Sequence, residues 1–107
     1  DYVFVEDVAR ANVLASSVAL PPVTAHESRA FNIATSKQTS VLELAAIVGR
    51  VMGVQPTLEF GETRPGELQR SALDVGKAKR VLGWQPEVSF DGWLPKLIEW
   101  FKAEATA

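Results

Sequence analysis

The chain begins with Asp1-Tyr2-Val3-Phe4-Val5-Glu6-Asp7-Val8-Ala9, a stretch in which a strand pattern gives way to a helix pattern. Residues 2–5 are β-branched or aromatic, which is typical of a short strand. Asp7 can accept a backbone N–H bond as the N-cap of a helix. Apolar residues then recur at helical spacing until Pro21 and Pro22; they are Val8, Ala11, Ala15 and Val18. The stretch therefore predicts a strand, a cap and a helix, in that order.

Further segments repeat this order. Residues 30–34 and 56–60 are two more strand candidates. Between them, Ser40 and Glu43 have the spacing of a capping box, in which each side chain accepts the other residue's N–H. Gly53 lies where a helix ends in the left-handed conformation. Strands that alternate with helices predict an α/β fold with some parallel pairing.

The second half of the chain is rich in turn and helix signals. Asp74 is expected to cap a short helix over residues 75–82, which Gly83 closes. A last helical stretch begins at Ser89, and Pro95 predicts an irregular start followed by regular helix. Three tryptophans are expected to seal a small core; they are Trp84, Trp93 and Trp100.

The composition excludes several classes of function. The 107 residues carry a formal net charge of −2 and are 47% hydrophobic, as in an ordinary soluble domain. The absence of cysteine excludes disulfides and thiolate metal sites, and a single histidine cannot build a multi-histidine site. The balance of charges argues against a nucleic-acid or membrane surface, and no apolar run reaches the length of a membrane helix. The sole methionine is Met52, so we expect a piece of a longer protein.

The most informative polar cluster is Arg64-Pro65-Gly66-Glu67. Arginine offers planar donors suited to phosphate or carboxylate, and glutamate can accept bonds from sugar hydroxyls. Pro65 and Gly66 favour a tight turn that would set the directions of the two charged side chains. The alternative is a structural turn with a surface salt bridge, and spacing alone favours this alternative.

Two other groups could carry chemistry. Glu6 and Asp7 could act as paired carboxylates, and His26 beside Glu27 could form a catalytic dyad. The simpler interpretations are a helix cap with an exposed neighbour and a solvated loop histidine, and the sequence favours both. No glycine-rich loop that cradles phosphate is present.

Taken together, several segments resemble the extended short-chain dehydrogenases/reductases, and most of all their NAD-dependent epimerase/dehydratase group, of the UDP-glucose 4-epimerase kind. The resemblance lies in residues 1–9, in Phe31-Asn32-Ile33-Ala34-Thr35-Ser36 with Ser40-Val41-Leu42-Glu43-Leu44, and in the Arg64–Glu67 loop. It continues through Asp74 to Lys79, Leu82-Gly83-Trp84-Gln85-Pro86 and Trp100-Phe101. These segments occur in the family's order over nearly the whole chain.

The resemblance implies a C-terminal fragment of a cytoplasmic enzyme that binds NAD and a nucleotide sugar. Residues 1–53 would be strand–helix units at the edge of its Rossmann sheet, and residues 54–107 a small α/β substrate-binding region. Arg64 would contact the substrate diphosphate and Glu67 the nucleotide ribose. NAD and the catalytic tyrosine and lysine would belong to the N-terminal domain of the parent, so the fragment alone would be inactive. We expect no nucleic-acid or membrane partner, and self-association through exposed apolar surface.

The chain departs from the family at Ala34-Thr35-Ser36, where members commonly have Gly-Thr-Gly. Two other hypotheses remain open at this stage. The chain could be a non-catalytic interaction module with the same fold remnant, or part of another extended short-chain reductase.

Overall fold

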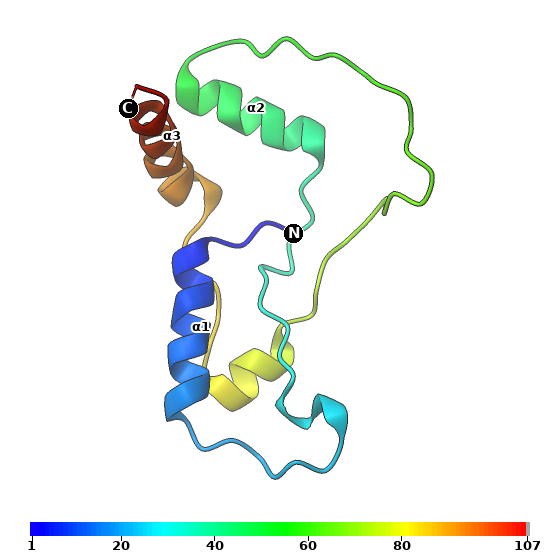
Figure 1. Cartoon of the computed structure of the whole chain (residues 1–107), viewed down its shortest axis with the longest axis vertical. Coiled ribbons are helices and arrows are strands. Elements are labelled where there is room, and N and C mark those ends of the chain that lie inside the picture. The colour runs from blue at the N-terminus through cyan, green and yellow to red at the C-terminus, as the bar shows by residue number, and fades with distance from the viewer. Residues whose placement is uncertain (107) are drawn as a thin grey trace. The chain divides into compact units, whose positions relative to one another are not determined.

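The computed structural model describes residues 1–106 (Figure 1). In chain order it contains helix α1 (Val5–Ser17), the 3-10 helix η1 (His26–Arg29), α2 (Val41–Met52), the π-helix η2 (Ala78–Leu82) and α3 (Phe90–Thr106). The chain forms two compact units. The first unit contains residues 1–38 and 71–87, and the second contains residues 39–70 and the C-terminal residues from 88.

The predicted strands are absent from the described part of the chain. Residues 2–4, 30–34 and 56–60 contain neither strand nor helix, and residue 5 already begins α1. An extended segment becomes a strand when a neighbour supplies a ladder of main-chain hydrogen bonds, and these segments have no such neighbour within residues 1–106. The expected α/β character is therefore not observed in residues 1–106, whose regular elements are helical.

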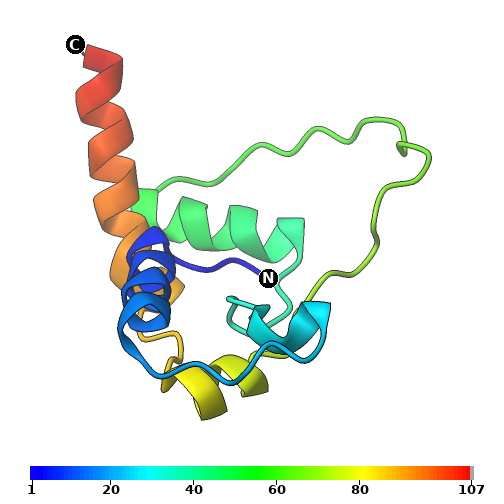
Figure 2. The same ribbon diagram turned by 60° about the horizontal axis from the view of Figure 1, so that its bottom comes forward.

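The first unit is built around Trp84, whose side chain is 0% exposed. It packs with Ala11 of α1 and with Ala78 and Leu82 of η2, and Figures 1 and 2 both show η2 beside α1. The expected short helix closed by a glycine is confirmed, because Gly83 follows η2 with φ 67°. The core thus joins the N-terminal helix to a segment some seventy residues later in the chain.

The second unit contains α2 and α3, which pack against each other. The capping box of α2 is confirmed: the Glu43 N–H donates to Ser40 Oγ at 3.1 Å, and the Ser40 N–H donates to Glu43 Oε2 at 2.6 Å. Gly53 ends the helix with φ 68°. An exposed ion pair of 2.8 Å between Arg50 and Asp91 adds a link between the two helices.

The expected irregular start of the last helix is wrong, since α3 runs continuously from Phe90 through Pro95. Pro95 is the sixth residue of α3 and lacks only the one N–H that would donate to the Asp91 carbonyl, and the helix continues through this single missing bond. The expectation for the tryptophans holds in part. Trp84 is buried and Trp93 is partly buried, but Trp100 is 55% exposed.

The two compact units are not divided at residue 53, because each takes residues from both sides of that position. The division into residues 1–53 and 54–107 describes the place of the chain in a longer enzyme, and as such it stays a prediction.

Candidate functional site

The Arg64–Glu67 segment forms a hydrogen-bonded β-turn in the second unit. The Glu67 N–H donates to the Arg64 carbonyl at 3.2 Å, and Gly66 has φ 80°. Proline at the second position and glycine with positive φ at the third are the signature of a type II turn. The turn brings Arg64 and Glu67, the two ends of the segment, close together. The predicted tight turn is therefore present, formed by the two residues expected to form it.

Both charged side chains of this turn are available to a ligand. Arg64 and Glu67 are exposed, as are all residues from 57 to 70. Within residues 1–106, no ion pair joins Arg64 to Glu67, so the surface salt bridge that the alternative required is not formed. The guanidinium keeps its full set of donors, and the carboxylate keeps both acceptor oxygens. Such a pair can offer charge-assisted bonds to a diphosphate and bonds to sugar hydroxyls.

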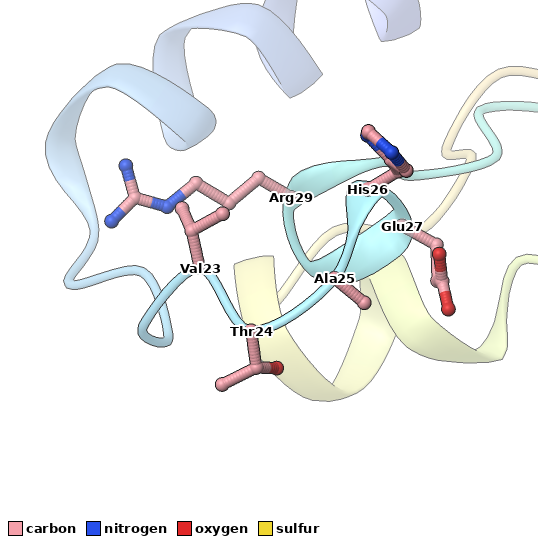
Figure 3. A pocket seen from close by; sticks show the side chains of 6 residues that line it. All are labelled: Val23, Thr24, Ala25, His26, Glu27 and Arg29. Atoms are coloured by element: carbon pink, nitrogen blue, oxygen red, sulfur yellow. The ribbon is translucent and has the colours of Figure 1, made fainter.

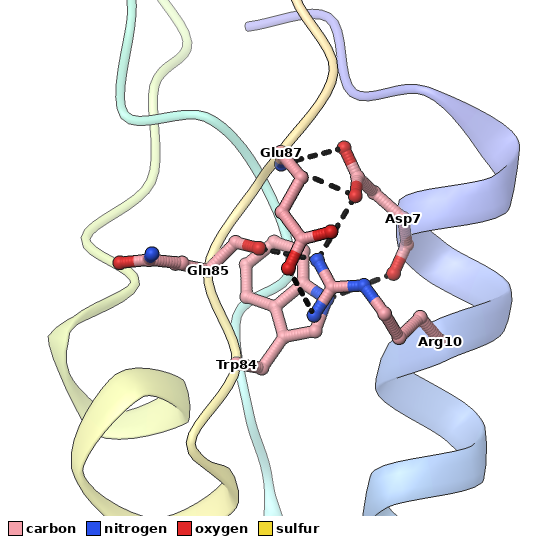
Figure 4. A network of polar contacts seen from close by, with 5 residues as sticks. All are labelled: Asp7, Arg10, Trp84, Gln85 and Glu87. Carbon is pink, nitrogen blue, oxygen red and sulfur yellow. Dashed lines mark hydrogen bonds and ion pairs between the residues drawn. The ribbon is translucent and has the colours of Figure 1, made fainter.

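Asp7 is neither a helix cap nor a free acid, which corrects both roles predicted for it, whereas Glu6 is exposed as the second interpretation expected. Phe4 occupies the N-cap position of α1, and Asp7 lies inside the helix with 2% exposure. Its two carboxylate oxygens accept the Glu87 N–H at 3.2 and 3.1 Å, and one also accepts from Arg10 at 3.0 Å (Figure 4). This carboxylate connects the segment after η2 to α1, and its role is structural.

The same contact involves the buried indole. Trp84 Nε1–H donates to the main-chain carbonyl of Asp7 at 2.8 Å, and the Arg10 guanidinium lies 5.8 Å from the indole ring centre (Figure 4). Arg10 also donates to the carbonyl of Gln85 and lies 3.5 Å from a Glu87 carboxylate oxygen. One sequence signal could have revealed the buried role of Asp7: it precedes the core residue Ala11 by four positions and therefore shares its helix face.

His26 and Glu27 do not form a dyad. Both lie in η1, where with Val23 and Arg29 they help to line a shallow pocket of the first unit. Figure 3 shows the imidazole and the carboxylate extending in different directions. Both residues are exposed, which agrees with the solvated loop histidine that the sequence favoured.

Four basic residues follow the turn within sixteen positions, and they differ in exposure; they are Arg70, Lys77, Lys79 and Arg80. Lys77 is partly buried: its ammonium donates to the carbonyls of Glu27 and Ala30 and lies 5.0 Å from the Phe31 ring centre. Arg70 stays exposed, as do the two basic residues of η2. Lys77 therefore holds η1 against the start of the η2 segment, and it is not part of an anion site.

The described residues fit neither a metal ion nor a dinucleotide. Within residues 1–106, no group of three or more His, Asp or Glu side chains could hold a metal. Dinucleotides bind at a glycine-rich turn between a strand and a helix. The positive-φ glycines here, Gly53, Gly66 and Gly83, each end a helix or form the turn described above.

Similarity to known proteins extends over nearly the whole chain. It is 38% identical over 102 residues to the UDP-glucose 4-epimerase of Mycolicibacterium smegmatis, covering 95% of this chain and 31% of that protein. It is 34% identical to a putative UDP-glucose 4-epimerase of Methanocaldococcus jannaschii, covering 95% of this chain and 30% of that protein. The chain belongs to the NAD-dependent epimerase/dehydratase family. This confirms the resemblance drawn from the sequence motifs.

The fold of this family member agrees with that of a solved structure. The Bordetella bronchiseptica enzyme WbmF, whose crystal structure is in complex with NADH, matches with a TM-score of 0.76 and 33% identity. The match covers 99% of this chain and 30% of the WbmF chain. The chain thus spans about a third of the length of the relatives that it matches.

No family model matches the chain. Among the helices of residues 1–106, none combines the length and the apolar character needed to cross a membrane.

Proposed function

We propose that this chain is the nucleotide-sugar-binding, C-terminal portion of an NAD-dependent sugar epimerase or dehydratase of the UDP-glucose 4-epimerase kind. In the complete enzyme, NAD and the catalytic tyrosine and lysine belong to the N-terminal domain. NAD supplies transient hydride transfer there. The residues of this chain bind and orient the substrate, and orientation alone can lower a barrier by several kcal/mol.

One observation carries the proposal: the exposed type II turn presents an arginine and a glutamate whose charges no ion pair within residues 1–106 engages. In the proposed complex, Arg64 donates to the diphosphate and Glu67 accepts from the ribose hydroxyls. The names of two relatives, a UDP-glucose 4-epimerase and a putative UDP-glucose 4-epimerase, support the substrate class.

The test is a titration of the full-length protein with UDP-glucose in a calorimeter. Arg64→Ala should weaken binding about tenfold or more, which corresponds to about 1.4 kcal/mol. Arg70→Ala is the matched control, because Arg70 is an exposed arginine six residues away that lies outside the turn. Equal affinities of Arg64→Ala and wild type would refute the role of Arg64 and favour the non-catalytic interaction module.

A second measurement concerns the chain by itself. We expect the isolated 107-residue polypeptide neither to bind NAD measurably nor to turn over a sugar nucleotide. NADH formation or epimerisation by this polypeptide would contradict the proposed division of roles. The coding sequence upstream of Asp1 should contain a glycine-rich loop followed by a Tyr-x-x-x-Lys pattern.

Titration of the same protein with dTDP-glucose distinguishes the nucleotide base, and product analysis distinguishes epimerisation from dehydration. We also propose a cytoplasmic, self-associating enzyme. Light scattering of the purified protein tests the self-association, and a clean monomer would contradict it.

A further inference from the structure

An extended segment leads from α2 to the turn that presents Arg64. Residues 55–64 contain no helix, turn or bend, and Figure 1 shows them as an open trace after α2. In an extended chain, successive side chains point to opposite sides, so every second residue shares a side. This alternation places Phe60, Glu62 and Arg64 along one side of the segment. All three belong to the second unit.

Phe60 is the most exposed large apolar residue of residues 1–106, at 81%. Leu58, two positions earlier on the same side, has a structural contact, because it lines a pocket together with residues of α2. Phe60 is not among the residues that line this pocket. An exposed aromatic ring keeps apolar surface in water, so a flat apolar partner that covers it is favoured. The Phe60 ring is therefore available to a ligand that lies along this side of the segment.

The ligand proposed for Arg64 carries a flat aromatic ring of its own. A nucleotide sugar contains a base, a ribose, a diphosphate and a sugar in this order, so its base lies one ribose away from the phosphates. The Cα atoms of Phe60 and Arg64 are about 13 Å apart in an extended segment, and both side chains are long enough to lean over this distance toward one ligand. Glu62 lies between them, where its carboxylate can accept from a ribose hydroxyl as Glu67 is proposed to do.

We propose that Phe60 binds the nucleobase of the substrate, against which its ring stacks while Arg64 holds the diphosphate. The inference rests on the proposed function of the Arg64 turn and adds a contact with the base to it. Stacking uses the π face, which every base has. Phe60 therefore raises the affinity for a nucleoside diphosphate without selecting which base it carries.

The test is a calorimetric titration of the full-length protein with UDP and with inorganic diphosphate, which has no base. Phe60→Ala should weaken UDP binding about five- to a hundredfold, the range of one base–aromatic stack, and leave inorganic diphosphate binding unchanged. Arg64→Ala should weaken the binding of both ligands, because both carry the diphosphate. Leu68→Ala is the matched control: Leu68 is 79% exposed in the same loop, and its replacement should change neither affinity.

Two further variants separate stacking from simple apolar cover. Phe60→Leu keeps an apolar side chain but has no π face, so it should lose most of the UDP affinity that Phe60→Ala loses. Phe60→Trp keeps a π face and should bind UDP at least as tightly as wild type. The fluorescence of its added indole should change when UDP binds, by more than wild type changes, and should not respond to inorganic diphosphate.

The outcomes distinguish the two proposals. If Arg64→Ala binds both ligands as well as wild type, the proposed function fails. If Arg64→Ala weakens binding but Phe60→Ala does not, the base contact fails and the function stands. A loss of thermal stability in Phe60→Ala at full UDP affinity would show instead that another part of the complete protein covers the ring. Equal losses of UDP and inorganic diphosphate affinity in Phe60→Ala, or full UDP affinity in Phe60→Leu, would also overturn the base contact.

Discussion

Asp7→Ala should be one of the most damaging single substitutions in the first unit. The side chain is 2% exposed and its carboxylate accepts the Glu87 N–H and an Arg10 N–H bond. Alanine leaves the Glu87 N–H without its acceptor and removes the carboxylate partner of Arg10. The polar contact that binds residues 84–87 to α1 would then depend on the Trp84 indole and the remaining bonds of Arg10.

The magnitude follows from these contacts. Loss of one partner of a buried charged pair costs about 3–5 kcal/mol. The Arg10 side chain is 31% exposed and has two further partners, Gln85 and Glu87. In Asp7→Ala the guanidinium therefore keeps part of its hydrogen bonding and its contact with water. We therefore expect Asp7→Ala to lower the free energy of unfolding by about 2–4 kcal/mol. Asp7→Asn keeps an acceptor for the Glu87 N–H and should cost about half as much.

Urea denaturation followed by circular dichroism at the helical band measures these losses. Glu6→Ala is the matched control, since it removes a carboxylate from the same first turn of α1 at an exposed position. It should change the free energy of unfolding by no more than about 0.5 kcal/mol. If Asp7→Ala and Glu6→Ala unfold at the same urea concentration, the Asp7 contact does not hold the first unit together.

Three other substitutions test local features of the fold. Ser40→Ala should destabilise α2 by about 1 kcal/mol, because it removes the acceptor of the Glu43 N–H; thermal unfolding measures this, and no loss would contradict the capping box. Gly49→Ala should lower the free energy of unfolding by about 1–3 kcal/mol, because the new Cβ would lie 2.7 Å from Pro56 Cδ. An unchanged urea midpoint would contradict this, since it would mean that Pro56 moves away at no cost. Trp84→Phe removes the indole N–H that donates to the buried Asp7 carbonyl, so the free energy of unfolding should fall by about 1–3 kcal/mol. Trp100→Phe is the control: Trp100 is exposed, and its replacement should not cause this loss.

The features that the sequence predicted correctly depend on neighbouring residues. The two ends of α2 are fixed by contacts within one or two turns of the helix, made by Ser40 and Glu43 at its start and by Gly53 at its end. The spacing of these residues was therefore enough to predict where the helix begins and ends. The same holds for the Arg64–Glu67 turn, which Pro65 and Gly66 determine through their own backbone preferences.

The features that the sequence did not predict depend on distant residues. A strand needs a partner that residues 30–34 do not find within residues 1–106, and no local pattern reveals this. The role of Asp7 depends on Glu87, eighty positions away, and the Asp1 carboxylate accepts from the Leu73 N–H, seventy-two positions away. Acidic residues near a predicted helix start suggested a cap, because capping is the common local role of such residues.

Asp1 and Asp7 solve the same physical problem in the first unit. Thr35, Leu73 and Glu87 lie in irregular segments, and each main-chain N–H needs an acceptor if it is shielded from water. In a sheet the acceptor would be a carbonyl of the adjacent strand; here each of the three N–H groups donates to a carboxylate oxygen of Asp1 or Asp7. A carboxylate has two oxygens and can therefore join two segments at once, as Asp1 does for Thr35 and Leu73. The two aspartates thus hold three irregular segments in place without a strand ladder.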